Sequence, residues 1–452
     1  MEPIVDTGER SAHYQNLLLA LLLPAALFNS YDGQLRALLL HQIQQNFHAS
    51  VASLGLINIP IGAGQFVAFF FVLRADRWGR RPVLVWSIVG YTLFTSLTAC
   101  SWDIWSFAAF QFGAQVFIGA EFGVAVTLLA EEVPADKRGR SLSKLLVFSP
   151  LGAIMAGLLL AVGMLHNPIG WRLFYLVATV PLAIAALMRR RLKESRAFVA
   201  TRQELSSNPA SFNKNVSFSN RFRESLNIWT RGSGKFLAAM CAIAFLQALP
   251  ASGAIGWWSY YAEHQRHLSV SLVGIFFAAA AGISLAGYFL CGRLMDKLGR
   301  RPTVIVYIVG ATIFAVGAFQ ASTPWLMLVL LMGTAFFGVG IAPVLSALAA
   351  ELFPTDNRAR ASAWIRNGAG NTGSVLGPAV VGLLGSTGAL IGNVGDTVSL
   401  LALVGLPIVF IVWRSLPETK GVGLVFPMDP DADRLSMREK MPTRKKPEAN
   451  GE

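Results

Sequence analysis

The chain has 452 residues, of which 54% are hydrophobic and 14% charged, with a formal net charge of +13. A soluble protein of this length carries about a quarter of charged residues, so the composition excludes a soluble globular protein and favours a membrane protein. The three cysteines, Cys100, Cys241 and Cys291, are scattered through apolar segments and predict neither a disulfide framework nor a metal site.

Apolar segments follow one another along almost the whole chain. A helix needs about 20 apolar residues to cross a hydrocarbon core of ~30 Å. The first segment, from Leu17 to Leu40, is too long for a signal peptide and has no small-residue cleavage site. We predict twelve transmembrane helices in two sets of six, at 17–42, 51–73, 83–100, 104–130, 143–165 and 171–188, then at 236–262, 270–292, 303–321, 324–350, 362–386 and 397–414.

This order predicts an all-α membrane protein made of two pseudo-symmetric six-helix bundles. The N-terminal bundle covers residues 1–188 and the C-terminal bundle covers residues 236–415. Residues 189–235 form a basic cytoplasmic linker between them, and residues 416–452 form a polar cytoplasmic tail.

The basic residues predict how the chain is oriented in the membrane. Of the 38 Lys and Arg residues, 34 fall in the termini and in loops on one side of the twelve-helix weave. The positive-inside rule places that side in the cytoplasm, so we predict a multi-pass protein of the plasma (inner) membrane with both termini cytoplasmic. The same placement accounts for the net charge, and we therefore predict no nucleic-acid partner.

Two loop sequences occur twice, 220 residues apart. The loop Asp76–Pro82 (DRWGRRP) returns as Asp296–Pro302 (DKLGRRP), and the residues conserved between Glu131–Arg140 and Glu351–Arg360 stand at the same offset. Two independent pairs in register indicate an internal duplication, as expected for a transporter built from repeats.

We predict that the duplicated residues form a cytoplasmic gating network in each half. Arginines on the loop can make charge-assisted hydrogen bonds to the helix-end Glu131 and Glu351, and glycine permits the tight turn. The alternative, that these arginines only set topology, does not account for the repeated Asp, Gly and Pro. The predicted members are Asp76, Arg77, Gly79, Arg80, Arg81, Glu131, Arg138, Glu194, Arg196, Gly292, Asp296, Gly299, Arg300, Arg301, Glu351 and Arg358.

The duplicated loops and the linker resemble those of the major facilitator superfamily, over essentially the whole chain. The segment Gly292–Arg301 matches the superfamily's loop signature, whereas Val72 replaces the usual glycine of the first copy. Pro417–Gly421 resembles the ending of sugar porters, and Gly119–Ala125 resembles a segment of metabolite–proton symporters. The resemblance implies the "sugar (and other) transporter" group, nearest to the metabolite/proton and organic-acid/proton symporters.

Four charged residues lie within the predicted spans, and each would be costly if it faced lipid. Asp32 and Arg36 are four residues apart, on one helix face with Asn29. They form either a proton or substrate site or a self-contained ion pair. Glu121 has no charged neighbour on its own helix, which predicts either a proton-binding group or a neutral hydrogen-bonded acid. Arg366 either extends toward the cytoplasm or holds a carboxylate substrate.

Polar and aromatic side chains supply the other candidates for a cavity wall. Two histidines on an outer loop, His264 and His267, have no further ligands nearby in the sequence, so we predict no metal site. The polar and aromatic candidates for proton or substrate contact are Gln115, Gln247, Trp258, Tyr261, Asn367 and Asn371, together with Asn29.

The sequence therefore predicts a proton-coupled symporter that moves a small polar metabolite, an organic anion or sugar-like solute, by alternating access. Alternatives are a proton-driven exporter of amphipathic compounds and a non-transporting nutrient sensor. No nucleophile–base or metal-ligand cluster lies in the spans, so we predict no enzyme. We predict a monomer in the lipid bilayer that binds a small molecule and no cofactor, with the proton as coupling ion.

Overall fold

The structure is a computed structural model, and it describes residues 12–133, 135–166, 170–190, 192, 194–195, 198–199, 229 and 234–420. Regular secondary structure in these ranges is entirely helical. Nine helices of the described chain are long and apolar enough to cross a membrane. The other three predicted spans, 17–42, 143–165 and 362–386, also fall on helices, so the all-α membrane fold is confirmed.

The N-terminal half contains eight α-helices and a short 3₁₀ turn among its described residues. The predicted second span is divided between α3 and α4, which meet at Ile57. The elements are α1 (Ala12–Leu38), α2 (Leu40–Phe47), α3 (Val51–Leu56), α4 (Asn58–Trp78), α5 (Arg80–Ala99), α6 (Ile104–Glu132), α7 (Ala135–Ala161), η1 (Met164–His166) and α8 (Arg172–Arg189).

The C-terminal half contains two π-helical segments, η3 and η4, in addition to its α-helices. They continue α11 and α16, so the predicted seventh and eleventh spans are not uniform α-helices. The elements are α11 (Gly234–Tyr260), η3 (Tyr261–Gln265), α12 (Val270–Lys297), α13 (Arg300–Gln320), α14 (Pro324–Gly340), α15 (Ala342–Glu351), α16 (Thr355–Ala363), η4 (Trp364–Gly370), α17 (Asn371–Leu384), α18 (Val394–Leu403) and α19 (Pro407–Ser415).

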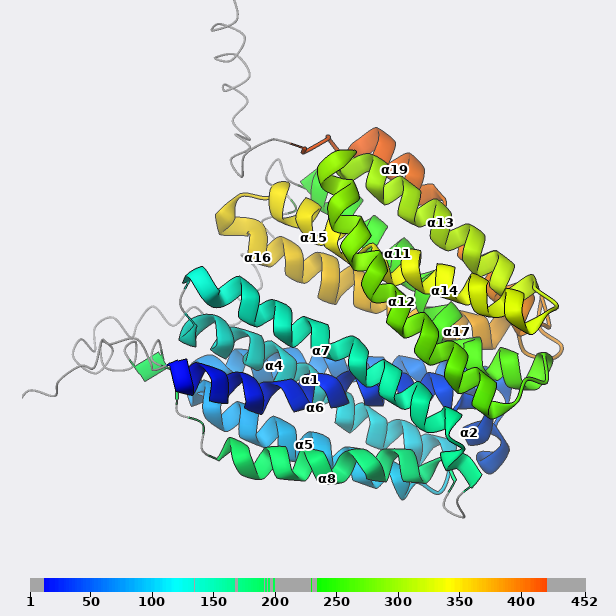
Figure 1. Cartoon of the computed structure of the whole chain (residues 1–452), viewed down its shortest axis with the longest axis horizontal. Helices are drawn as coiled ribbons and strands as arrows, with labels where there is room; N and C mark the ends of the chain where they lie inside the picture. Colours follow the sequence, from blue (N-terminus) through cyan, green and yellow to red (C-terminus); the bar gives the residue numbers. More distant parts are fainter. Residues whose placement is uncertain are drawn as a thin grey trace, which may run out of the picture.

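Figure 1 shows the two halves stacked on each other, with the helices of both running roughly along the long axis of the molecule. One end of each half carries a repeated loop, at residues 74–82 and 293–301, and we call it the repeat-loop end. We call the opposite end, which carries α2 and η3, the far end. Most of the linker and the tail, predicted at 189–235 and 416–452, lie outside the described residues.

Local sequence signals set where several helices begin. The Asp103 carboxylate accepts a hydrogen bond from the Ser106 backbone N–H at 2.7 Å, and the Ser106 hydroxyl lies 3.1 Å from the Asp103 N–H, which completes a capping box before α6. Gly79 and Gly299, at φ 100° and 105°, precede α5 and α13. Because side chains disfavour positive φ, glycine is the residue suited to both turns, as the sequence predicted.

The halves contact each other along α7 with α12, α1 with α11, and α17 with α3 and α4. At the far end, Gly55 on α3 lies against Gly382 on α17, and a Cβ added to either would lie within 2.7 Å of the other's Cα. Small residues at a helix crossing let two backbones approach closely, which is how helices gain packing energy inside a membrane.

This crossing leads to a prediction about heat stability. Gly382→Ala should lower the free energy of unfolding by about 1–3 kcal/mol, because the added methyl group has no room between the two backbones. Gly282→Ala is the matched control, because a Cβ there meets nothing within 4 Å. Thermal unfolding in detergent, followed by tryptophan fluorescence, would measure both. Equal midpoints for the two variants would contradict the close packing of Gly55 and Gly382.

Candidate functional site

A cavity of about 280 Å³ lies where the two halves meet. We call it the interface cavity. Its N-terminal wall comes from α1, α2, α4 and α6, and its C-terminal wall comes from α11 and α17. The polar side chains among its lining residues are Gln34, Arg36, Asn58, Ser252 and Ser374.

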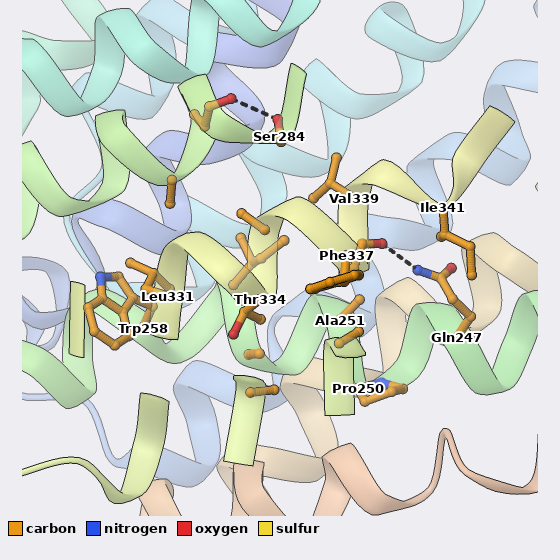
Figure 2. A pocket seen from close by; sticks show the side chains of 18 of the residues that line it. Gln247, Pro250, Ala251, Trp258, Ser284, Leu331, Thr334, Phe337, Val339 and Ile341 are labelled. Atoms are coloured by element: carbon orange, nitrogen blue, oxygen red, sulfur yellow. Dashed lines mark hydrogen bonds between the residues drawn. The ribbon is translucent and has the colours of Figure 1, made fainter. Parts of the chain in front are cut away.

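A second cavity of about 250 Å³ lies mainly among helices of the C-terminal half, and we call it the C-half cavity. Figure 2 shows its wall, in which Trp258, Leu331 and Phe337 give an apolar surface. Gln247 donates a hydrogen bond from Nε2 to the Gly338 carbonyl at 3.0 Å, drawn as a dashed line in Figure 2. Gln34 and several serine, threonine and tyrosine side chains, such as Ser284 and Thr334, supply the remaining polarity.

The two cavities adjoin, because Gln34 on α1 and Ile255 on α11 line both. Arg36 is the only charged side chain among the described residues that line either cavity. The interface cavity therefore has one cationic wall, whereas the C-half cavity is uncharged and largely apolar.

Arg36 contacts no carboxylate among the described residues. Its Nε is buried without a hydrogen-bond partner, and no ion pair within 4.0 Å joins it to Asp32. The two side chains therefore make no contacting ion pair, although their opposite charges still act on each other across one helical turn. The two residues lie one helical turn apart, yet Arg36 lines the interface cavity and Asp32 lines neither cavity.

Asp32 is completely buried inside the N-terminal half, and neither carboxyl oxygen has a hydrogen-bond partner among the described residues. Two neighbouring tyrosines do not donate to it. The Tyr31 hydroxyl donates to the Phe174 carbonyl and the Tyr91 hydroxyl to the Phe28 carbonyl, both at 2.8 Å. Burial without hydrogen-bond donors disfavours a carboxylate here, and the positive charge of Arg36, one helical turn away on α1, is what offsets that cost.

Two other polar atoms close to Asp32 also have no hydrogen-bond partner. The Tyr175 hydroxyl and the Gln111 carbonyl oxygen are buried, although Gln111 Nε2 donates to Thr98 Oγ1 at 3.2 Å. Such groups are costly in a protein interior unless protons or waters satisfy them. A proton on Asp32 can supply a donor to one of them.

Glu121 has a different environment from the one that its own helix suggested. Its carboxylate pairs with the guanidinium of Arg189 at 2.6 Å, and both residues are buried. Arg189 Nε also donates to the Leu21 carbonyl at 3.2 Å, so the pair joins α6, α8 and α1. Glu121 has no charged neighbour on its own helix, as the sequence shows, but α8 supplies one, so neither predicted alternative, the proton-binding group or the neutral acid, describes this ion-paired carboxylate. The predicted sixth span stopped one residue before Arg189, which placed this arginine in the linker.

The remaining predicted site residues divide between the cavities and other places. Gln247 and Trp258 line the C-half cavity, while the other predicted residues line neither cavity. Gln115 is buried and accepts a hydrogen bond from Gln65 at 3.1 Å. The Tyr261 hydroxyl contacts the Phe319 carbonyl and accepts from Arg266 Nε at 2.6 Å. The other residues outside the cavities are the half-buried Asn29 and Asn371 and the exposed Arg366 and Asn367.

The gating network of the N-terminal half is present around Arg80. Its guanidinium donates to Glu131 at 3.0 Å and to the Ala75 carbonyl at 3.2 Å. Glu194 accepts from the backbone N–H groups of Arg80 at 2.7 Å and of Arg81 at 3.2 Å, at the start of α5. Ser195 contacts Glu131, so the segment after α8 closes the network.

The C-terminal half repeats these contacts with equivalent residues. Arg300 donates to Glu351 at 2.8 Å and to the Met295 carbonyl at 2.9 Å, and it pairs with Asp296 at 3.5 Å. Glu418 accepts from the backbone N–H groups of Arg300 at 2.8 Å and of Arg301 at 3.1 Å. Burial raises the pKa of Glu418, but these backbone hydrogen bonds outweigh it and hold the pKa below its ordinary value.

Each network joins residues of its own half only, so it stiffens that half at the repeat-loop end. Their opening and closing during transport stays a prediction. Arg358 does not join the Glu351 network, because its Nε and Nη2 are buried without partners. Gly292 does not mark a close packing contact either, since a Cβ there would meet nothing within 4 Å. The predicted members Asp76, Arg77, Arg138 and Arg196 lie outside the described side chains.

Several residues of these sites were missed by sequence reasoning. Arg189 and Glu263 each stand one residue beyond a predicted span, and both are buried. Glu418 and Thr419 belong to a segment that was noted only as a resemblance. The signal that could have found them is the pairing of Glu194-Ser195 with Glu418-Thr419, one acid and one hydroxyl residue after the last helix of each half.

Comparisons with known proteins agree with this architecture. The family model for the Major Facilitator Superfamily matches residues 22–257 and 236–427. A cis,cis-muconate transport protein of Acinetobacter baylyi is 28% identical, covering 81% of this chain and 86% of that protein. A gallate transporter of Pseudomonas putida is 26% identical, covering 88% and 90%. A bacterial homologue of the human lysosomal transporter Spinster, in an inward-facing and occupied conformation, has a similar fold, with a TM-score of 0.73 at 15% identity over 90% of this chain and 98% of that one.

The Glu121–Arg189 pair leads to a prediction about stability. Glu121→Gln should lower the free energy of unfolding by about 3–5 kcal/mol, because it leaves the buried Arg189 without a counter-charge. The double variant Glu121→Leu with Arg189→Met should recover most of the loss, since it removes both charges. Heat stability in detergent would measure both. A single variant as stable as the unsubstituted protein would contradict a buried ion pair.

Proposed function

Because the chain belongs to the major facilitator superfamily, we propose that this multi-pass membrane transporter of a small molecule is a proton-coupled symporter of small organic carboxylates. Its relatives are transporters and not enzymes. The observation that carries the proposal is the Arg36 guanidinium, which lines the interface cavity and makes no ion pair within 4.0 Å among the described residues.

Arg36 suits a carboxylate because guanidinium presents a planar fork of donors that can bind two carboxylate oxygens at once. A buried cation without a counter-charge is unfavourable, so an entering anion gains more here than it would at the surface. The adjoining C-half cavity, lined by Trp258, Leu331 and Phe337, accommodates an uncharged or apolar body. The relatives named for muconate and gallate support an organic acid as substrate.

The proton coupling follows from counting buried charges. In the empty carrier, ionised Asp32 and Arg36 sum to zero. In the loaded carrier, neutral Asp32 and the pair of Arg36 with the substrate carboxylate again sum to zero. Binding the anion without the proton, or the proton without the anion, leaves one net charge in the membrane interior, which is costly. Reorientation is therefore easiest when both are bound or both are absent.

Following the positive-inside rule, we take the repeat-loop end, which carries most of the basic loops, as the cytoplasmic end. In alternating access, the two halves rock about the central cavities, so that substrate and proton enter from the far end and leave at the repeat-loop end. A second candidate is a proton-driven exporter of amphipathic compounds, which the apolar wall of the C-half cavity favours. The direction of accumulation in oriented proteoliposomes distinguishes the two: the symporter concentrates acids with an inward proton gradient.

The first test addresses Arg36, using uptake into proteoliposomes under an imposed proton gradient with a panel of carboxylic acids, sugars and amines. Arg36→Gln should raise the KM for the accepted acid by about 10- to 100-fold, because it removes charge-assisted hydrogen bonds of about 1.5–3 kcal/mol. Arg36→Lys should lie in between. Arg293→Gln, at an exposed arginine stacked on Phe289, is the control. Unchanged KM values in Arg36→Gln, or uptake of sugars alone, would reject carboxylate binding.

The second test addresses Asp32. Asp32→Asn should abolish accumulation driven by a proton gradient but retain exchange of labelled for unlabelled substrate, because the amide imitates the protonated acid and cannot release a proton. Asp396→Asn is the control, since Asp396 is exposed and bound to Gln320 at 2.9 Å. An Asp32→Asn protein that still accumulates substrate against its gradient would show that the coupling proton binds elsewhere.

A further inference from the structure

A buried carboxyl group lies at the far end of the interface between the halves, away from both cavities. Glu263, in η3, is 8% exposed and accepts a hydrogen bond from Gln42 Nε2 of α2 at 2.6 Å. Its neighbour Ser259, on α11, is 1% exposed and lies 2.6 Å from the Leu38 carbonyl at the end of α1. Both contacts cross between the halves, and we call these four residues the far-end clasp.

The single hydroxyl proton of Ser259 has two possible acceptors in the clasp. Ser259 Oγ lies 2.6 Å from the Leu38 carbonyl oxygen and 2.9 Å from Glu263 Oε1. A hydroxyl has one proton to donate, and a carbonyl oxygen can only accept. If Ser259 donates to Leu38, its contact with Glu263 is a hydrogen bond only when the Glu263 carboxyl carries a proton and donates it to Ser259 Oγ.

Loss of that proton would weaken the clasp in two ways. The carboxylate would compete for the single Ser259 proton, and the Leu38 carbonyl would lose its donor from the other half. It would also place a negative charge in a buried site, where an uncompensated ion is costly. Separation of the halves at the far end would expose Glu263 to water and remove both penalties.

Other titratable groups surround the clasp without bonding to Glu263. His41 on α2 contacts Tyr260 and His264, with ring centroids 5.9 and 5.5 Å away, and Tyr260 and His264 are 5.0 Å apart. Arg266, after η3, donates to the Tyr261 hydroxyl at 2.6 Å. Asp396 on α18 binds Gln320. Among the described residues, no cation forms an ion pair with Glu263. A deprotonated Glu263 would therefore be a buried negative charge without a contacting counter-charge.

We propose that Glu263 is a second proton-binding residue, whose proton holds the far end of the transporter closed. By linkage, a state that binds a proton more tightly is favoured as the pH falls. Acid at the far end therefore drives closure, and alkali favours opening. Because Glu263 is enclosed between the halves when the far end is closed, its proton leaves only when that end reopens. The proton gates the carrier and returns to the side from which it came.

The experiment measures far-end opening directly, without substrate or gradient, so its result does not depend on which solute is carried. The three native cysteines are replaced by serine, and spin labels are attached through Trp102→Cys and Leu390→Cys, at exposed positions on the two halves. Distances between the labels are measured in lipid nanodiscs over a pH series. We expect the short-distance population to decrease as the pH rises.

Glu263→Gln should abolish this pH response and keep the short distance throughout. Its carboxamide donates to Ser259 and accepts from Gln42, as the protonated acid does. Ser259→Ala should shift the population toward long distances at every pH and flatten the response, which provides a test should Glu263→Gln fold poorly. A pH response in Glu263→Gln with the midpoint of the parent protein, or a Ser259→Ala variant that behaves as the parent does, would overturn the proposal.

A further variant separates Glu263 from the neighbouring histidines. The double variant His41→Gln with His264→Gln should keep the pH response. Loss of the response in this variant would assign the closure to the histidines and would overturn the proposal. The number of protons carried per substrate should be the same in Glu263→Gln as in the parent protein, because a gating proton is not transported. A lower ratio would also overturn it.

Discussion

Moving a charged side chain from water into a membrane interior is unfavourable by several kcal/mol unless a partner of opposite charge or a set of hydrogen bonds compensates it. Two answers to this constraint occur in the N-terminal half. Glu121 and Arg189 compensate each other's charge at 2.6 Å, in a contact that joins three helices. Asp32 and Arg36 make no contacting ion pair, and Arg36 lines a cavity of about 280 Å³ while Asp32 is buried one helical turn away. Their unsatisfied state is what a substrate and a proton can relieve.

The duplication divides the molecule into parts that are the same in both halves and parts that are not. The repeat-loop networks match residue for residue, with Arg80 and Glu131 equivalent to Arg300 and Glu351. At the same offset, Arg36 corresponds to Gly256, and both line the interface cavity. One half thus supplies the charge and the other leaves space opposite it. The repeat-loop networks can be the same in both halves because they only stiffen each half. A binding site for an asymmetric molecule benefits from two cavity walls of different chemistry.

The fold and the loop networks could be predicted from the sequence because their signals are local. Apolar runs of about 20 residues, glycines at turns and duplicated motifs do not require knowledge of distant contacts. The charge pairing could not be predicted in the same way. Glu121 was considered with its own helix, yet its partner lies 68 residues later, and Arg189 and Glu263 each fell one residue outside a predicted span. An error of one residue at a helix end was enough to remove both from the list of buried charges.

The same two helices connect the clasp to the binding site. Arg36 lines the interface cavity, and Leu38, two residues later on α1, is the acceptor in the clasp. On α11, Trp257 lines that cavity, and Ser259 follows two residues later. A displacement that separates Ser259 from Leu38 must therefore also move the walls that carry Arg36 and Trp257, because a helix transmits motion along its axis over such short distances. Closure at the far end and the shape of the anion site are two consequences of one contact between α1 and α11. Glu263 lies four residues after Ser259 and Arg36 two residues before Leu38, so a proton on the first and an anion on the second act on the same contact.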